Sequence, residues 1–195
     1  MTHIPRSAIR PQTDFYPTPP EATRALLSVE RFSGRIWEPC AGDGAMYDVL
    51  AAAGYPVMAT TIEGTDSRSR VIGDTDFLMV DRLPENCGAI VTNPPFRIVE
   101  TIVQHALDLD PPKICMLLNI KFLSGVGRCR GLFAMNPPSR VHVFADRVTM
   151  YPGGYDGPKG TTTETMMWAV WDSSHIGAPT IGWLIAGDHK RGGAK

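Results

Sequence analysis

Four consecutive residues, Asn93-Pro94-Pro95-Phe96, combine groups that could hold a planar amino group. The two prolines fix an extended backbone and remove two amide donors, which leaves the Asn93 side-chain oxygen and the Pro94 carbonyl as rigidly placed acceptors. Such a pair is suited to bind an NH2 group, and Phe96 could stack on the ring or amide that carries it. The alternative is a turn that only ends the preceding strand.

A second candidate site is the run Glu38-Pro39-Cys40-Ala41-Gly42-Asp43-Gly44, between a predicted strand and a predicted helix. Open α/β sheets bind ligands beyond the carboxyl ends of their strands. Gly42 and Gly44 would let the backbone approach a ligand and bend sharply into the helix. A dinucleotide-binding loop would need a third glycine where Tyr47 stands, so a nicotinamide or flavin cofactor is disfavoured. Taken alone, a purely structural glycine turn explains the run as well.

Alternating strands and helices would position both motifs. The predicted strands are 35–38, 57–62, 77–80, 89–92 and 114–118, and the predicted helices are 21–31, 45–53 and 98–109. This alternation predicts a parallel α/β sheet with right-handed crossovers. Two later strands, 141–144 and 166–171, are joined by a Gly- and Thr-rich stretch without a helix, which predicts an antiparallel pair at the edge of the sheet.

The composition is that of one globular domain. The chain has 195 residues, of which 43% are hydrophobic and 20% charged. No apolar run is long enough to span a membrane and no signal peptide is recognisable, so we expect a cytoplasmic protein without a membrane partner. The spacing of the four cysteines matches no zinc site, and we expect reduced thiols and no bound metal.

Basic residues are concentrated in the second half of the chain. The net charge is −1, yet residues 121–165 contain six basic and three acidic side chains. Lys121, Arg128, Arg130 and Arg140 are therefore candidate phosphate contacts, the alternative being an ordinary solvated surface. The glycine-rich segment 151–164 suits a loop that becomes ordered on a nucleic acid, or an unconstrained connection.

Together with Asp14 to Pro19 before them and Asp76-Phe77 between them, these motifs resemble, in this order, those of the S-adenosylmethionine-dependent methyltransferases of amino groups. The resemblance is strongest to the DNA adenine-N6 methyltransferases, including small phage-type members. The resemblance covers most of the chain and implies a Rossmann-like class I methyltransferase fold with a mostly parallel seven-stranded sheet and an antiparallel edge hairpin. It implies S-adenosyl-L-methionine as cofactor, with Asn93, Pro94, Pro95 and Phe96 as the catalytic tetrapeptide. The implied cofactor-binding residues are Tyr16, Thr18, Pro19, Glu38, Cys40, Gly42, Gly44, Asp76 and Phe77.

One position departs from the family pattern. The family usually has an acidic residue at the tip of the second strand to bind the ribose hydroxyls, where this chain offers Thr61. Glu63 lies two residues further on and 21 residues after Gly42, near the spacing of about 20 expected for a ribose-binding acid. We therefore assign this role to Glu63, with Asp66 as a substitute. The alternative is a solvent-exposed acidic loop.

The resemblance makes adenine in DNA the expected substrate, in a bacterium or phage-infected cell. Two alternatives keep the cofactor and replace the substrate by RNA adenine or a protein glutamine amide, and a third is a non-catalytic binding protein. We expect a cofactor-covering segment over 1–33, a single methyltransferase domain over 34–188 with its recognition region at 121–164, and a disordered tail over 189–195. The protein is expected to be a monomer or homodimer.

Overall fold

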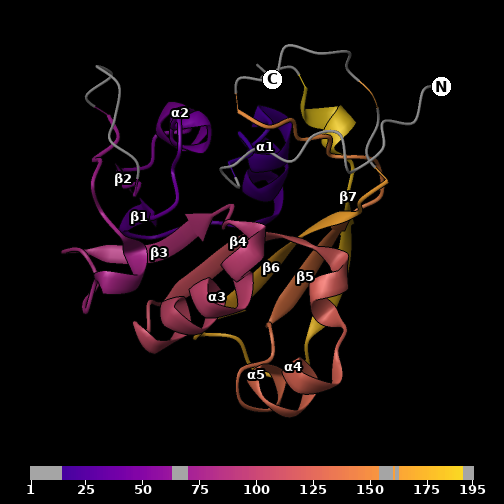
Figure 1. Cartoon of the computed structure of the whole chain (residues 1–195). Helices are drawn as coiled ribbons and strands as arrows, with labels where there is room; N and C mark the ends of the chain where they lie inside the picture. Colours follow the sequence, from indigo (N-terminus) through magenta and orange to yellow (C-terminus); the bar gives the residue numbers. More distant parts are fainter. Residues whose placement is uncertain (1–14, 63–69, 154–159, 161–162, 191–195) are drawn as a thin grey trace.

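A seven-stranded sheet with helices on both faces forms the protein (Figure 1). The computed structural model describes residues 15–62, 70–153, 160 and 163–190. The strands are β1 Arg35–Glu38, β2 Val57–Ala59, β3 Cys87–Thr92, β4 Lys113–Asn119, β5 Arg140–Phe144, β6 Met166–Asp172 and β7 Thr180–Leu184. The helices are α1 Pro20–Val29, α2 Ala45–Ala52, α3 Val99–Asp108, α4 Val126–Arg130 and α5 Leu132–Met135. Short 3-10 turns are η2 Phe77–Met79, η3 Phe96–Ile98, η4 Ile120–Leu123 and η5 Ala186–His189.

The strand order is β2-β1-β3-β4-β6-β5-β7. Among these strands only β6 runs antiparallel to its neighbours, β4 and β5. The predicted α/β class and the antiparallel pairing of 141–144 with 166–171 are confirmed. The sequence did not indicate β7, which pairs in parallel with β5 and forms the edge. The antiparallel pair therefore lies one strand in from the edge.

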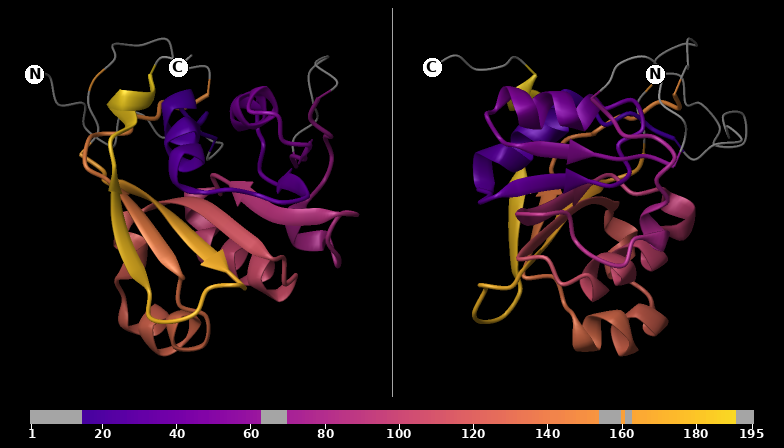
Figure 2. Two further views of the ribbon diagram at one scale, coloured as in Figure 1. Left: turned by 180° about the vertical axis from the view of Figure 1, so that it is seen from behind. Right: turned by 90° about the vertical axis from the view of Figure 1, so that its left-hand side faces the viewer.

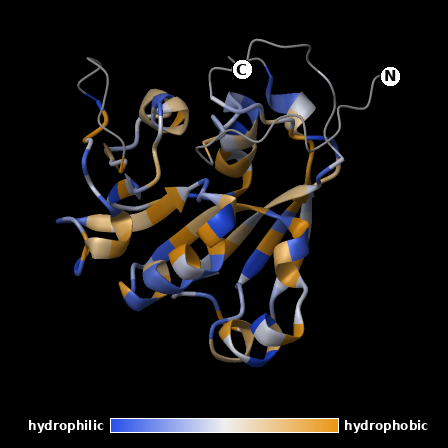
Figure 3. Cartoon of the chain, viewed as in Figure 1, coloured by the Kyte–Doolittle hydropathy of each residue, from blue (hydrophilic) through white to orange (hydrophobic). Residues whose placement is uncertain are grey.

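The two faces of the sheet are covered by different helices. α1, α2 and η5 lie over one face, and α3, α4 and α5 lie over the other (Figures 1 and 2). The five central residues of β4, 114–118, are all buried, as the apolar sequence predicted. Apolar residues are accordingly concentrated in the central strands (Figure 3). None of the helices in the described part of the chain combines the length and hydrophobicity required to cross a bilayer.

Two predicted strands between α2 and β3 differ in the structure. The strand predicted over 57–62 is shortened to β2, after which Thr60 forms a single parallel bridge with Ile72. The strand predicted over 77–80 is wrong: η2 occupies this place. The turn forms here for a local reason. The Asp76 carboxylate accepts a hydrogen bond from the Leu78 backbone amide at 3.0 Å, which stabilises a turn in place of a strand.

A close contact between two glycines fixes the beginnings of β1 and β3. A Cβ atom on Gly88 would lie 1.6 Å from the Ser33 carbonyl oxygen, and one on Gly34 would lie 2.8 Å from the Asn86 carbonyl oxygen. Gly34 also has a φ of 72°, which disfavours any side chain. The two strands can therefore adopt their observed register only with glycine at both positions.

A network of ion pairs lies at the amino ends of the parallel strands. Glu30, only 3% exposed, accepts hydrogen bonds from Arg140 at 2.7 and 2.9 Å and from Lys113 at 3.0 Å. Asp172 also pairs with Arg140, at 2.6 Å, and the His142 ring lies 3.0 Å from Glu30. Burial alone would raise the pKa of Glu30, but its hydrogen bonds from His142, Arg140 and Lys113 outweigh burial and lower the pKa to about 2.

Stability should fall steeply in acid because of Glu30. A carboxylate whose folded-state pKa is depressed contributes stability above its unfolded value, near 4.5, and loses that contribution as the pH falls towards 2. At 1.36 kcal/mol per pKa unit the loss is about 3 kcal/mol. We expect Glu30→Gln to cost about 3–5 kcal/mol at pH 7 in urea unfolding, because it removes the buried carboxylate that Arg140 and Lys113 share and leaves Asp172 as their one remaining carboxylate partner in the network. The cost should shrink near pH 2.

The exposed Glu85 supplies the control, since Glu85→Gln should leave the free energy of unfolding within about 0.5 kcal/mol of wild type. A Glu30→Gln variant as stable as wild type at pH 7 would contradict the importance of the network.

Candidate active site

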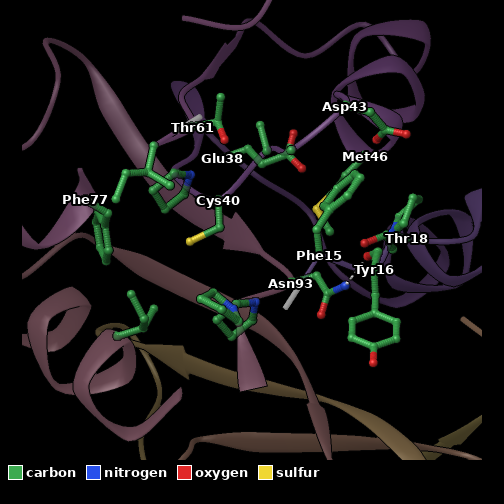
Figure 4. Close-up of a pocket in the computed structure, with 18 of the residues that line it drawn as sticks. Phe15, Tyr16, Thr18, Glu38, Cys40, Asp43, Met46, Thr61, Phe77 and Asn93 are labelled. Atoms are coloured by element: carbon green, nitrogen blue, oxygen red, sulfur yellow. Dashed lines mark hydrogen bonds between the residues drawn. The ribbon is translucent and has the colours of Figure 1, made fainter. Parts of the chain in front are cut away.

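A cavity of about 250 Å³ opens at the carboxyl ends of β1 and β3. Figure 4 shows side chains from the N-terminal segment, the loop after β1 and the tetrapeptide after β3 gathered around it. The sequence-predicted residues that line it are Tyr16, Thr18, Glu38, Cys40, Gly42, Asp76, Phe77, Asn93, Pro94, Pro95 and Phe96. The fold thus brings together residues up to 80 positions apart in one place. Of the remaining predictions, Pro19 and Gly44 flank the lining, and Glu63 and its substitute Asp66 lie outside the described residues.

The glycine loop after β1 has the conformation that its composition predicted. Gly42 has a φ of 53° and Gly44 a φ of 80°, values that side chains rarely adopt. Gly44 directly precedes α2 and is its N-cap residue. A Cβ atom on Gly42 would lie 2.1 Å from Cε2 of Phe15, so the N-terminal segment packs directly on this loop.

Glu38 is a buried carboxyl group at the end of β1. It is 2% exposed, and its Oε2 atom has no hydrogen-bond partner among the described residues. Burial raises the pKa of Glu38 well above its ordinary value, and Asp43 and Asp48 add to this, while a backbone hydrogen bond from Tyr47 opposes it. A buried carboxyl with a free oxygen is suited to a cationic group or hydrogen-bond donor in the cavity.

Cys40 follows Glu38 by two residues, in the loop after β1. Burial is the main cause that raises the pKa of its thiol to about 12. At neutral pH the thiol is therefore in its neutral form, which is a weak nucleophile, and it forms part of the cavity lining.

The Asn93 carboxamide is held in one orientation. Its Nδ2 atom donates to the Tyr16 carbonyl oxygen at 3.1 Å and contacts the Met150 sulfur at 3.5 Å (Figure 4 shows the Asn93 and Tyr16 side chains). With Nδ2 engaged, Oδ1 is a buried acceptor that no described residue satisfies. A buried unpaired acceptor is costly, which makes it a candidate ligand-binding atom.

Two aromatic rings lie beside this acceptor. The Tyr16 and Phe96 ring centroids are 5.8 Å apart with an interplanar angle of 44°. Both residues line the cavity and are partly exposed. They offer a planar ligand group apolar surfaces close to Asn93.

Asp76 and Phe77 also line the cavity, and both have structural partners. Asp76 is the N-cap of η2, and Phe77 packs edge-on against Trp37 and His105 at centroid distances of 5.2 and 4.8 Å. Thr61, which is 7% exposed, also lines the cavity.

Several residues of the site were not singled out individually from the sequence, and Phe15, Met46 and Met150 are among them. Phe15 and Met46 line the cavity and Met150 contacts Asn93. Phe15 directly precedes the predicted Tyr16, so the motif that contains Tyr16 could have indicated it. Met150 lies 57 residues after Asn93, and nothing in its local sequence indicates the contact.

The four predicted phosphate contacts do not form one surface. Arg140 belongs to the ion-pair network at the other end of the sheet, so its assignment as a phosphate contact is corrected. Arg128 donates to the Phe122 and Ser124 carbonyls, pairs with Glu100 at 3.2 Å and stacks on Phe122, which indicates a role in holding η4 and α4.

Lys121 and Arg130 are the accessible members of the set. The Lys121 side chain is 72% exposed and pairs with Glu164 at 3.3 Å. Arg130 is exposed on α4.

Comparison with known proteins identifies the fold. No protein-family model matches the sequence, and neither does any curated protein. Among solved structures, a predicted O-methyltransferase, protein Atu636 from Agrobacterium tumefaciens, is similar over 84% of both chains with 12% identity and a TM-score of 0.51. The 1,6-didemethyltoxoflavin-N1-methyltransferase of Burkholderia thailandensis is similar over 79% of this chain and 77% of its own, with 13% identity and a TM-score of 0.50. The chain has the Rossmann-like fold of class I methyltransferases.

Glu38 should destabilise the protein without ligand. Since its folded-state pKa is raised, the unfolded chain loses the proton first, and stability falls as the pH rises above about 4.5. Glu38→Gln removes the penalty while keeping an acceptor for the Tyr47 amide. We expect the variant to be more stable than wild type by roughly 1–3 kcal/mol at pH 8, and by less at pH 5, in urea unfolding.

Here too the control is Glu85→Gln, which should show no such pH dependence. A Glu38→Gln variant that unfolds more easily than wild type at pH 8 would show that Glu38 is ionised and satisfied.

Proposed function

We propose that the protein is an S-adenosyl-L-methionine-dependent methyltransferase that methylates the N6 amino group of adenine in DNA. The observation that carries the proposal is the Asn93 carboxamide, whose Nδ2 is bound to Tyr16 while Oδ1 is a buried acceptor with no partner in the described chain. An acceptor fixed in this way, beside two aromatic rings and the glycine loop, fits an NH2 group on a planar ring.

The residues of the cavity fit the proposed cofactor. The glycine loop admits a ligand close to the backbone at Gly42, and the free Glu38 carboxyl oxygen suits the cationic amino acid part of S-adenosylmethionine. Thr61 and Asp76 would hold its nucleoside part, together with Glu63, which remains our assignment for the ribose. When bound, the cofactor supplies an electrophilic methyl group on a sulfonium.

The tetrapeptide would activate the amine of the substrate. The lone pair of an exocyclic adenine nitrogen is delocalised into the ring, which makes it a poor nucleophile. Hydrogen bonds from the two N–H groups to Asn93 Oδ1 and the Pro94 carbonyl favour a tetrahedral nitrogen with its lone pair directed away from them. The rigid Asn-Pro-Pro backbone holds both acceptors in place before the substrate arrives.

A base buried in a duplex must leave the helix to reach Asn93. Phe96, paired with Tyr16, offers a stacking surface for a base that has been flipped out. Lys121 and Arg130 are exposed cations in the segments that follow β4, and we propose that they contact the phosphate backbone. Arg140 belongs to the ion-pair network at the other end of the sheet and is not part of this proposed binding surface.

Transfer of labelled methyl groups tests the proposal directly. The protein is incubated with S-adenosylmethionine and, in parallel, duplex DNA, single-stranded DNA, RNA and protein, and the modified nucleoside or residue is identified. We expect N6-methyladenine in DNA. Asn93→Ala should reduce kcat by at least about 100-fold, as for loss of a fixed hydrogen-bonding group at a reacting centre, while the Kd for S-adenosylhomocysteine changes little.

Asn136→Ala, at the end of α5 and outside the cavity, is the matched control and should keep the wild-type rate. Label found only in RNA or only in protein would replace DNA by that substrate, and binding of the cofactor without transfer to any of them would favour a binding protein. An Asn93→Ala variant with most of its activity would refute the role of the tetrapeptide.

Salt dependence tests the phosphate contacts. Each phosphate neutralised on duplex DNA contributes about 0.9 to the slope of log K against log salt. Lys121→Gln and Arg130→Gln should each reduce the slope by about that amount and weaken binding regardless of sequence. Arg140→Gln should instead lower stability and leave the slope unchanged; a reduced slope for Arg140→Gln in folded protein would reverse our correction.

A further inference from the structure

Phe15 occupies the space between two glycines that lie 111 residues apart in the chain. One edge of its ring packs on Gly42, where an added Cβ would lie 2.1 Å from Cε2. The opposite edge packs on Gly153, where an added Cβ would lie 2.2 Å from Cδ1. The Phe15 carbonyl also accepts a hydrogen bond from the Gly153 amide at 3.0 Å. Movement of the ring along the line from one glycine towards the other would therefore press it on the second glycine.

The segment that contains Gly153 reaches Asn93 by a second contact. Three residues before Gly153, the Met150 sulfur lies 3.5 Å from Asn93 Nδ2. The residue after Phe15 supplies the other partner, because the Tyr16 carbonyl accepts from the same Nδ2 atom. Both groups that orient the carboxamide thus belong to short segments joined to the Phe15 ring or backbone.

We propose that Phe15 is a positioning residue that links ligand binding at the Gly42 loop to the orientation of Asn93. This inference rests on the proposed function, since it assigns the Gly42 loop to the cofactor and Asn93 to the substrate amine. A cofactor that fills the cavity holds the ring against Gly153, and the 150–153 segment then holds Met150 against Asn93. A displaced ring affects both sites together, because linkage between two binding sites acts in both directions.

Gly153→Ala tests the link at a distance from the cofactor. No positive φ is recorded for Gly153, so the added methyl acts by its contact with Phe15 alone. We expect it to push the ring towards Gly42 and to weaken binding of S-adenosylhomocysteine about tenfold, within the usual range of coupling between sites. At saturating cofactor, kcat should also fall, because Asn93 loses the support of Met150.

The decisive variant combines Gly153→Ala with Phe15→Ala. Phe15→Ala alone should weaken cofactor-analogue binding and lower kcat, and it leaves space for the added methyl. In the Phe15→Ala background, Gly153→Ala should cause no further loss of affinity for the analogue. If each substitution acted independently on the structure, the fold-losses of affinity would instead multiply in the double variant. Gly127→Ala on α4 is the matched control, since its Cβ would meet no atom within 4 Å, and it should bind the analogue like wild type.

Calorimetry with S-adenosylhomocysteine, on wild type, the two single variants, the double variant and the Gly127→Ala control, distinguishes the possible failures. If wild type does not bind it, the proposed cofactor is wrong and this inference falls with it. If wild type binds but Gly153→Ala binds equally well, or if the losses multiply, the proposed function stands and the role of Phe15 is overturned.

Discussion

The hydrogen bond from Asn93 Nδ2 to the Tyr16 carbonyl is the contact on which the arrangement of the site depends. It joins the segment before α1 to the tetrapeptide after β3, and it decides which end of the carboxamide is left for a ligand. Without it, the amide could rotate and present donors in place of an acceptor. The N-terminal segment is therefore part of the site, although it lies outside the sheet.

Carboxyl groups at the two ends of the sheet have pKa values shifted in opposite directions. At the amino ends of the parallel strands, Glu30 and Asp172 are paired with Lys113 and Arg140, and the pKa of each acid is lowered. At the carboxyl ends, Glu38 has no cationic partner among the described residues and its pKa is raised. The first arrangement stabilises the fold, and the second stores a cost that a suitable ligand relieves.

Local sequence was sufficient for the elements with strong apolar patterns and for the two motifs. β4, α2 and the glycine loop follow from short runs of residues, and the cavity unites most of the residues chosen from the motifs. It was insufficient where a side chain competes with the backbone, as at Asp76, and where a contact spans many residues, as between Met150 and Asn93. Charge alone likewise could not distinguish Arg140, a member of a buried network, from an exposed cation such as Arg130.

The contact between Gly34 and Gly88 restricts how the length of the chain can vary. Glu38 is four residues after Gly34, and Asn93 is five residues after Gly88. The glycine contact at one end of the two strands therefore sets the positions of these two polar groups, relative to each other, at the other end. Side chains alternate between faces along a strand, so inserting or deleting one residue in either interval would turn its polar group away from the cavity. Length changes in relatives of this chain are therefore expected in its connections, while these two intervals keep a constant number of residues.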